Sequence, residues 1–474
     1  MSDWITTIGL EIHAQLITNS KIFSSSPNKF GSSPNVNASL IDLGFPGTLP
    51  TINESVIKQA VKFGIATNAD IAKFSVFARK NYFYPDLPKN YQISQYENPI
   101  IIGGSININL EDGSEKKIEL TRAHLEEDAG KSIHDQVNGK TYLDLNRAGT
   151  PLLEIVSEPQ ISNSFEAVQY MKKIHEIVTS LEICDGNMQE GSFRCDANVS
   201  VRKVGQEKLG TRTELKNINS FKFIEKAIEY EVDRQIEVLE SGGKINQETR
   251  LYDEKSQTTR SMRSKEEAND YRYFPDPDLL PICITKDYIN KVKSNMPMMP
   301  EERKRIYHEE YLLNDDQVNI LSGNIEISNY MDKIFKESSI SPKEAMNLFM
   351  KVLYPIYSKQ FSKIIEAEII VNAINLMNKK NIDSYKMTQI LKEMTNSNAS
   401  IEELLNQENV NAEEFDLEKI IKEIADNNPQ LVKDYKNGKQ KVIGFFVGQI
   451  LKATNKKCNP AEAKKKIEQY LKNS

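Results

Sequence analysis

The chain opens on the stretch Thr6-Thr7-Ile8-Gly9-Leu10-Glu11-Ile12-His13-Ala14-Gln15-Leu16, in which apolar and polar residues alternate. Alternation with a period of two predicts a β-strand with one buried face. Glu11 and His13 share the polar face, and strand residues two apart are separated by roughly 6.6 Å. Both side chains can therefore reach one cation from a rigid support, although a strand with a solvated polar face would show the same alternation.

The composition describes a globular chain. It has 474 residues, of which 39% are apolar and 27% charged, and its mean hydropathy is −0.52. This length predicts two to four domains. The sequence has no apolar run long enough for a bilayer and no signal peptide pattern, so we expect a cytoplasmic protein without a membrane segment. Its four cysteines form no CxxC pair, so we expect reduced thiols and no structural zinc.

Turn residues divide the N-terminal part of the chain into strands and ordered loops, whereas the part beyond residue 296 follows a helical pattern. The sequence therefore predicts an α+β fold. An N-terminal domain with a large, mostly antiparallel sheet plus helices is followed by an all-helical region and a basic helical tail. We place the domains at residues 1–292, 293–407 and 408–474, and expect the second boundary to be accurate only to several residues.

Three local patterns predict individual elements. Residues 106–110 and 117–120 alternate on either side of a turn sequence, which predicts a β-hairpin. Asn163 followed by Glu166 resembles a capping box at the start of a helix. A second amphipathic helix is expected over residues 220–241, where two glycines follow as a stop signal.

Charge is unevenly distributed along the chain. The formal net charge is −6, but residues 431–474 hold eleven lysines and three acidic residues. Lys436, Lys439 and Lys441 precede an apolar helix expected at 442–453. Lysines at the start of a helix can bind phosphates through charge, independently of the base sequence. We therefore expect this tail to bind a polyanion. A lysine-rich solvated face would look the same.

Two clusters of carboxylates accompany the opening strand. Glu126-Glu127-Asp128 places three acids together between His124 and Lys131, and adjacent acids repel unless they are solvated, paired or bound to metal. Glu154 stands alone in the apolar run 151–156, where a buried charge without a partner costs several kcal/mol. Both patterns predict a cation nearby.

A divalent metal ion is one such cation. Mg²⁺ takes a few carboxylates and keeps water or phosphate oxygens as its other ligands, which Glu11, Glu154 and one of Glu126 or Glu127 would suit. His13 is an unusual ligand for so hard an ion, and it leaves open a Mn²⁺ or Zn²⁺ site or a role outside the metal's ligands. The alternative is a set of salt bridges to arginines, for which the candidates are Arg79, Arg122 and Arg147.

The stretch from Phe77 to Asp86 places positive charge next to aromatic residues. Arg79 and Lys80 with Tyr82 would suit a triphosphate and its base, the lysine acting as a point charge on phosphate. The chain has no Walker A or GxGxxG pattern, so this nucleotide site would be of an unfamiliar kind. An aromatic-rich strand edge with a solvated lysine is the simpler interpretation.

Several longer blocks cover the chain in order and are highly specific. They include Gly9-Leu10-Glu11-Ile12-His13, Arg79-Lys80-Asn81-Tyr82-Phe83-Tyr84-Pro85-Asp86, His124-Leu125-Glu126-Glu127-Asp128-Ala129-Gly130-Lys131, Thr150-Pro151-Leu152-Leu153-Glu154-Ile155-Val156, Arg194-Cys195-Asp196-Ala197-Asn198, Glu214-Leu215-Lys216-Asn217-Ile218-Asn219, Asp270-Tyr271-Arg272-Tyr273-Phe274-Pro275 and Asp434-Tyr435-Lys436-Asn437-Gly438-Lys439. These blocks resemble the signature blocks of the B subunits of the aspartyl/glutamyl-tRNA amidotransferase family.

The resemblance implies a heterotrimer in which this chain joins a glutaminase subunit and a third, small subunit. Such a complex corrects misacylated Glu-tRNA(Gln) or Asp-tRNA(Asn). The glutaminase frees ammonia from glutamine, and the chain with the quoted blocks uses ATP to phosphorylate the side-chain carboxylate of the tRNA-bound amino acid. Ammonia then displaces the phosphate and leaves an amide.

The resemblance also implies roles for individual residues. The implied Mg²⁺ ligands, which are also catalytic, are Glu11, His13, Glu127 and Glu154, with Glu126 the alternative to Glu127. The implied ATP-binding residues are Lys80, Arg79 and Tyr82, Lys80 being catalytic as well. The residues expected to line the ammonia route or to orient the aminoacyl end are Arg194, Asp196, Asn198, Lys216 and Asn217, although a hydrogen-bonded sheet edge would use the same residue types. The residues expected to bind tRNA are Lys436, Lys439 and Lys441, by the shape of the RNA rather than its bases.

Two functions of other classes compete with this interpretation. One is a non-catalytic scaffold that binds tRNA and docks the glutaminase, but a scaffold has no need of Glu154 inside an apolar run. The other is a stand-alone metal-dependent phosphotransferase acting on a small molecule, which the basic tail argues against. The sequence does not decide whether Gln-tRNA, Asn-tRNA or both are made.

Overall fold

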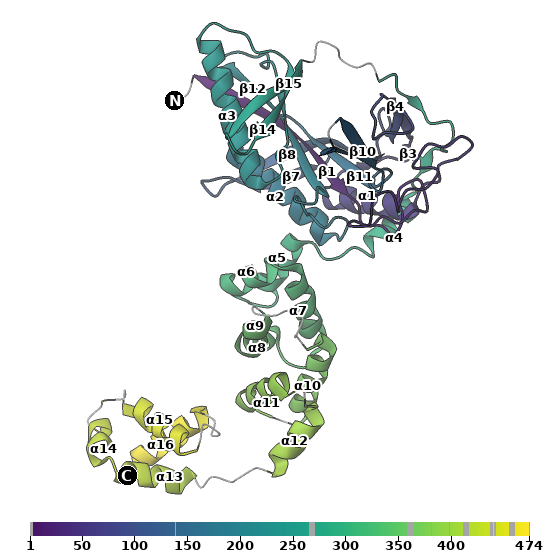
Figure 1. The fold of residues 1–474 in the computed structure, drawn as a ribbon. Helices are drawn as coiled ribbons and strands as arrows, with labels where there is room; N and C mark the ends of the chain where they lie inside the picture. The colour runs from purple at the N-terminus through teal and green to yellow at the C-terminus, as the bar shows by residue number, and fades with distance from the viewer. Residues whose placement is uncertain are drawn as a thin grey trace. The chain divides into compact units, whose positions relative to one another are not determined.

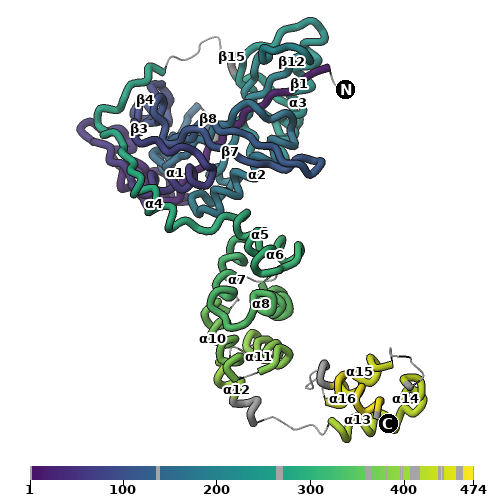
Figure 2. The backbone as a smooth tube through the Cα atoms, turned by 180° about the vertical axis from the view of Figure 1, so that it is seen from behind, coloured from purple at the N-terminus to yellow at the C-terminus, as the bar shows by residue number. Residues whose placement is uncertain are grey.

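The computed structural model describes residues 3–474 except 138, 265–270, 358–364, 381, 398, 411–416, 437–438, 440–441, 455–459 and 474. The chain divides into two compact units, Met1–Glu302 and Arg303–Ser474, and each is described by itself (Figures 1 and 2). The expected boundaries at 292/293 and 407/408 fall within helices α4 (Lys286–Lys293) and α12 (Ile401–Val410). The division into three domains stays a prediction.

A 10-stranded sheet forms the first unit, in the order β15-β14-β13-β12-β1-β11-β8-β6-β2, with β7 also paired to β8. Its strands are β15 (Thr258–Ser264), β14 (Glu248–Asp253), β13 (Thr213–Lys216), β12 (Phe193–Lys203), β1 (Trp4–Gln15), β11 (Pro151–Ser157), β8 (Glu115–Glu127), β6 (Ile101–Ile102), β2 (Asp70–Ile71) and β7 (Ser105–Asn109). Of the described strand pairs only β13 and β14 are parallel. The predicted α+β class with a mostly antiparallel sheet is confirmed.

The opening stretch is a central strand of this sheet, as its alternation predicts. In β1 the side chains of Ile8, Leu10 and Ile12 are at most 1% exposed, and they join the main hydrophobic core. Glu11 and His13 lie on the other face and are only partly buried. The hairpin is also confirmed, because β7 pairs with β8 in antiparallel register.

Three helices supply the other side of this core, and Figure 1 shows α2 and α3 beside the sheet. They are α1 (Glu54–Ala66), α2 (Ser164–Ser180) and α3 (Phe221–Glu240). At α2 the Asn163 side chain accepts a bond from the Glu166 N–H, as predicted, but the Glu166 carboxylate accepts from the Ser162 N–H instead of closing the box on Asn163. Gly242, at φ +79°, follows the end of α3 and serves as the predicted stop.

Three smaller sheets complete the strands of this unit. They are β16 (Phe274–Pro275) with β4 (Ala78–Asn81) and β5 (Tyr91–Ser94), β9 (Lys131–Val137) with β10 (Lys140–Asp144), and β17 (Ile282–Cys283) with β3 (Phe74–Ser75). The first of them brings residues from the segments around 80, 92 and 274 next to one another. These segments come from distant parts of the sequence, so no local pattern predicts their pairing.

The second unit is helical, as predicted. Its helices are α5 (Pro300–Glu309), which begins in the first unit, α6 (Asp315–Ser322), α7 (Ile325–Glu337), α8 (Pro342–Leu348), the π-helix η1 (Phe349–Leu353), α9 (Tyr354–Tyr357), α10 (Ala367–Lys379), α11 (Ser384–Ser397), α12, α13 (Leu417–Asp426), α14 (Pro429–Lys436), α15 (Ile443–Ala453) and α16 (Pro460–Asn473). One apolar core joins residues 307–405, and a separate one joins residues 417–471. Among the helices described, none is both long and apolar enough to cross a bilayer.

Candidate active site

Four adjacent strands carry one row of polar residues on the face opposite the core. His13 on β1 is paired with Arg194 on β12 and with Glu154 on β11, and Glu154 is in turn paired with His124 on β8. Directly paired residues of antiparallel strands point to the same face. The register therefore gathers side chains from four distant segments at one place.

His13 lies at the centre of this cluster. Its Nε2 atom is 3.4 Å from an oxygen of Glu154, 3.6 Å from one of Glu11 and 3.9 Å from one of Glu126. Burial lowers the pKa of His13, but the hydrogen bond to Glu154 and the charges of the three carboxylates outweigh burial and raise it to about 9. In the absence of a metal ion, His13 is therefore a cation.

The apolar surroundings of Glu154 predict a cationic partner, and its partners in the structure are two histidines, His13 and His124. Its Oε2 atom is also 3.5 Å from Nε2 of His124. Burial raises the pKa of Glu154, whereas His124 and His13 lower it well below the ordinary value. Within the described part of the chain, no arginine forms a salt bridge with Glu11, Glu126 or Glu154, so the arginine alternative is not what the structure shows at these three positions.

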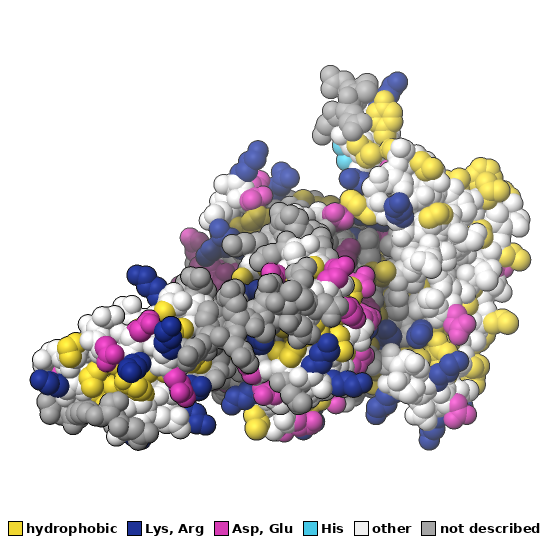
Figure 3. Space-filling model, turned by 90° about the horizontal axis from the view of Figure 1, so that it is seen from below, with side chains coloured by type: hydrophobic (Ala, Val, Ile, Leu, Met, Phe, Trp, Pro, Cys, Tyr) yellow, Lys and Arg dark blue, Asp and Glu magenta, His cyan; other side chains and the backbone are white. Residues whose placement is uncertain are grey.

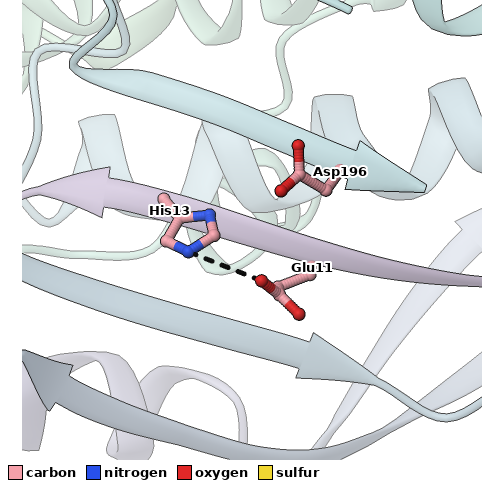
Figure 4. Close-up of side chains that lie close together, drawn as sticks. All are labelled: Glu11, His13 and Asp196. Atoms are coloured by element: carbon pink, nitrogen blue, oxygen red, sulfur yellow. Dashed lines mark ion pairs between the residues drawn. The ribbon is translucent and has the colours of Figure 1, made fainter. Parts of the chain in front are cut away.

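Glu11 belongs to a second group at the same place. It is paired across β1 and β12 with Asp196, and Figure 4 shows these two carboxylates beside His13. Burial and then the charge of Glu154 raise the pKa of Glu11. Asp196 accepts a hydrogen bond from Lys216 of β13, which brings a cation to the edge of the group.

These side chains fit a divalent cation. In the group Glu11, His13 and Asp196, and in the group His13, Glu126 and Glu154, the atoms that could bind a metal lie within 4.8 Å of one another. Carboxylate oxygens suit a hard ion, and one imidazole nitrogen also suits Mn²⁺ or Zn²⁺. A bound cation would replace the proton that His13 otherwise carries.

The structure places Glu126, and not Glu127, in this cluster. Consecutive strand residues point to opposite faces, so Glu127 lies on the core side of β8 with Leu125. There Lys89 donates hydrogen bonds to its carboxylate, and the N–H of Ile93 donates another at 2.9 Å. Glu126 instead faces His13 and accepts a bond from the Ser94 hydroxyl at 3.1 Å. The geometry favours Glu126, which the sequence left as the alternative to Glu127, as the ligand at this position.

Lys80 extends toward the cluster from β4. Its Nζ atom lies 4.9 Å from the centre of the Tyr271 ring. Burial lowers the pKa of Lys80, but Glu126, then Tyr273 and Glu154, raise it overall, so the amine is charged next to these carboxylates. A fixed cation that these carboxylates stabilise suits an anionic substrate group.

Arg79 and Tyr82 are placed differently from Lys80. Arg79 donates hydrogen bonds to Asp276 and Asp278, each at 2.8 Å, and its guanidinium lies 4.2 Å from the centre of the Tyr91 ring. These partners occupy Arg79 away from the carboxylate cluster. Tyr82 packs edge to face against Tyr271 at 6.0 Å and lines an open pocket of about 440 Å³.

The residues expected on the ammonia route or at the aminoacyl end divide into two sets. Arg194, Asp196 and Lys216 border the cluster, and Arg194 also donates a 2.8 Å bond to the buried Asp128. Asn198 lies further along β12, opposite Gly9. Asn217 follows β13 at φ +66° and donates to the Tyr252 carbonyl at 3.0 Å, so its side chain serves the backbone.

The lysines expected to bind tRNA are only partly described. Lys436 is the last residue of α14, and Lys441 lies outside the described residues. Lys439 is 68% exposed at its side chain, with Nζ 3.3 Å from Asp434. An exposed lysine with one carboxylate neighbour fits either a phosphate contact or a solvated surface.

Sequence reasoning missed two residues that matter here. His124 was noted only as a neighbour of the acidic run, yet it contacts both Glu126 and Glu154. Lys89, the partner of Glu127, carried no signal because it lies in a loop 38 residues before that glutamate. Strand parity was the available signal for His124, since it shares a face with Glu126.

Comparison with known proteins finds family models and relatives that cover both units of the chain. The family model described as the GatB/GatE catalytic domain matches residues 6–290, and the GatB domain model matches residues 329–471. Proteins named as B subunits of the aspartyl/glutamyl-tRNA(Asn/Gln) amidotransferase are similar over 99% of the chain. They include those of Halorhodospira halophila (49% identity, 99% of that protein), Thioalkalivibrio sulfidiphilus (50%, 100%) and Coxiella burnetii (47%, 100%).

The catalytic-domain match alone covers more than half of the chain and contains every residue of the carboxylate cluster. The relatives align with both units from end to end. The chain therefore belongs to the GatB/GatE family, as a B subunit of the aspartyl/glutamyl-tRNA(Asn/Gln) amidotransferase type.

Proposed function

We propose that this chain carries out the ATP-dependent transamidation of misacylated tRNA. The substrates are Glu-tRNA(Gln), Asp-tRNA(Asn) or both. A side-chain carboxylate oxygen attacks the γ-phosphorus of ATP, and ADP leaves. Ammonia then forms the C–N bond, phosphate leaves and a proton is released, which gives the amide. The observation that supports this proposal is the cluster of carboxylates around His13 in a chain whose relatives are named amidotransferase subunits.

Mg²⁺ fits the donor set of this cluster. The residues proposed to hold it are Glu11, His13, Glu126, Glu154 and Asp196. When bound, the ion supplies positive charge between two anionic groups that must approach one another, the substrate carboxylate and the triphosphate. In this proposal Glu126 replaces Glu127 as a Mg²⁺ ligand.

The chain's own cations complete the proposal. Lys80 holds a phosphate group at the edge of the cluster, because it is a fixed charge beside Glu126 and Glu154. Arg194 and Lys216 hold the substrate end on the opposite side, where Asp128 and Asp196 orient them. Tyr82 lines an open pocket, which suits the base of the nucleotide.

The remaining partners follow from the same proposal. A glutaminase subunit delivers ammonia, and a small third subunit completes a heterotrimer. The lysine-rich tail binds the tRNA body. Because the substrate is a tRNA used in translation, we expect the protein to act in the cytoplasm. Lys439 is the tail lysine whose exposed side chain supports this step.

The test is amide formation by the reconstituted trimer. The trimer is incubated with ATP, Mg²⁺, glutamine and either Glu-tRNA(Gln) or Asp-tRNA(Asn), and the amino acid released from the tRNA is identified. We expect glutamine or asparagine with matching ADP formation. Glutamine hydrolysis without any amidated tRNA, and without tRNA-stimulated ATP hydrolysis, would instead favour a scaffold.

A further inference from the structure

Four aromatic side chains contact one another in a line beside the carboxylate cluster, and they are here called the tyrosine row: Tyr82, Tyr271, Tyr273 and Tyr96. Tyr82 meets Tyr271 edge to face, with ring centres 6.0 Å apart, and Tyr271 meets Tyr273 in the same way at 6.1 Å. Tyr273 stacks face to face on Tyr96, with ring centres 4.2 Å apart and planes inclined by 5°. Both arrangements are favourable for aromatic rings, so each ring fixes the orientation of the next.

Segments from both edges of the small sheet β16-β4-β5 hold the tyrosine row in place. Tyr96 follows the end of β5 by two residues, and Tyr273 directly precedes β16. Asn81 of the central strand β4 donates its N–H to the Tyr271 carbonyl at 3.0 Å and its side chain to the Arg272 carbonyl at 2.8 Å. A binding surface that is fixed before a ligand arrives loses little conformational entropy when the ligand binds.

The tyrosine row extends to the carboxylate cluster. Ser94, two residues before Tyr96, donates its hydroxyl to Glu126 at 3.1 Å. Burial raises the pKa of Tyr273 to about 12, with the carboxylates of the cluster adding to the rise and Lys80 opposing it. Tyr273 is therefore a neutral ring close to both the acids and the lysine of the cluster. A ligand bound to the row would lie next to the reaction site.

The two ends of the row differ in charge. At one end, Nζ of Lys80 lies 5.9 Å from the centre of the Tyr82 ring and 4.9 Å from that of Tyr271. At the other end, no lysine or arginine of the described chain lies over the Tyr96 ring. Tyr273 covers one face of Tyr96, yet the residue is 56% exposed, so its outer face is open. This end suits a planar ring that carries no triphosphate.

We propose that the outer face of Tyr96 stacks on the 3′-terminal adenine of the misacylated tRNA. The inference rests on the proposed function, in which both substrates carry an adenine ring: ATP, and the tRNA, whose terminal adenosine is esterified with the amino acid. The proposed function assigns the adenine of ATP to the pocket beside Tyr82. The second adenine needs a place from which its amino acid reaches the cluster. Proteins hold unpaired RNA bases by stacking them on aromatic side chains.

Charge alone would not place this end of the tRNA. On the face that Figure 3 shows, the described Lys and Arg side chains are interspersed with acidic and uncharged ones. Phosphate contacts are independent of the base sequence and allow a nucleic acid to slide, whereas a base stacked on a fixed ring is held at one place. Tyr96 would therefore determine how far the aminoacyl end enters the site.

The experiment uses two probes of the tRNA end, 3′-glutamylamino-3′-deoxyadenosine and the same compound without its base. The Kd of the reconstituted trimer for each probe is measured by calorimetry with the wild type, Tyr96→Ala, Tyr96→Phe and the control Phe74→Ala, whose side chain on β3 is also 56% exposed. We expect the wild type to bind the adenosine probe at least about tenfold more tightly than the base-free probe. Tyr96→Ala should lose most of this preference, whereas Tyr96→Phe and the control should retain it. The KM for ATP should not change in any variant.

Each other outcome contradicts the stacking site. Equal weakening of both probes by Tyr96→Ala would show that the ring only supports the surrounding structure. A raised KM for ATP with an unchanged probe preference would assign the ring to the adenine of ATP. A wild-type trimer that amidates tRNA but binds both probes equally would overturn the stacking site and leave the proposed function intact, whereas a trimer that amidates no tRNA would overturn the proposed function and this inference with it.

Discussion

His13 lies directly opposite Glu154 across the β1/β11 pair, with its Nε2 atom 3.4 Å from the Glu154 carboxylate. Because strand side chains alternate, a slip of one residue in this register would carry Glu154 into the core and Ile155 onto the polar face. The apolar residues on either side of Glu154 prevent that slip. The core packing that stabilises the sheet therefore also fixes the geometry of the reaction site.

Replacing Glu154 with glutamine tests this relationship. Glu154→Gln keeps the shape of the side chain but removes the charge that His13, His124 and the proposed metal ion share. We expect amidation by the trimer to fall on the order of 100- to 1,000-fold, with glutamine hydrolysis retained. The control is Glu119→Gln, an exposed glutamate on the neighbouring strand β8, which should amidate normally. Normal amidation by Glu154→Gln at saturating Mg²⁺ would remove this residue from the site.

Local sequence patterns predicted individual strands and helices of the fold. Alternation identified β1 and both of its faces, and the capping residue Asn163 identified the start of α2. The row that joins β12, β1, β11 and β8 was not predictable, because strand order depends on contacts between distant segments, such as the pairs of His13 with Glu154 and of His13 with Arg194. The candidate residues were thus found one by one, and only the structure shows which of them meet.

Sequence reasoning left the choice between Glu126 and Glu127 open. Leu125 is a core residue on β8, so strand parity places Glu127 beside it and Glu126 on the polar face. The resemblance to a family implied Glu127, with Glu126 as the alternative. The pairing of Glu127 with Lys89 had no local signal, since a loop residue and a strand residue meet there.

The two adjacent glutamates should therefore respond differently to substitution. Glu126→Gln is expected to weaken Mn²⁺ binding to the chain at least about tenfold and to abolish amidation, because it removes a donor of the cluster. Glu127→Gln leaves Lys89 buried without its carboxylate, which should destabilise the chain by about 3 kcal/mol. Calorimetric Mn²⁺ titration and urea unfolding separate the two effects. Equal losses of Mn²⁺ affinity in both variants would contradict the assignment of Glu126.

The buried ion pair of Lys21 and Asp42 gives a stability prediction. Lys21→Met leaves the buried carboxylate of Asp42 without its cation, and removal of one partner of a buried pair typically costs about 3–5 kcal/mol. Lys58→Met, at an exposed position on α1, should change the free energy of unfolding by less than about 0.5 kcal/mol. Urea unfolding measures both. An equally small effect of Lys21→Met would mean that the hydrogen bonds from Ser24 and from the Ser39 N–H suffice to hold Asp42.

A second buried carboxylate gives a pH dependence. Burial raises the pKa of Glu231, but hydrogen bonds from Arg234, Gln235 and Thr213 outweigh burial and lower it overall. A carboxyl whose pKa is lower in the folded than in the unfolded state stabilises the fold above its unfolded pKa of about 4.5, and the stabilisation is lost as the pH falls below that value.

Glu231→Gln should accordingly be destabilised most at neutral pH, by about 1–3 kcal/mol. Its deficit relative to the wild type should shrink as the pH falls below about 4.5. Thermal unfolding of both chains between about pH 7 and about pH 2.5 measures the deficit. Glu229→Gln, at the exposed neighbouring Glu229 on α3, should show no such trend. A deficit that stays constant with pH would show that the hydrogen bonds, and not the charge, make the contribution.

Removal of the tail tests the tRNA part of the proposed function. The apolar core of residues 417–471 is separate from the other two, so a chain that ends after Val410 keeps the N-terminal core and the core of the first helical region intact. We expect this truncated chain to unfold at nearly the same temperature and to bind tRNA at least about tenfold more weakly, with a smaller dependence of affinity on salt, because fewer lysines release counterions. Filter binding at two salt concentrations measures the change. Because α12 is retained whole, unchanged tRNA affinity and salt dependence would exclude the lysine-rich tail from tRNA binding and leave the chemistry of the carboxylate cluster unaffected.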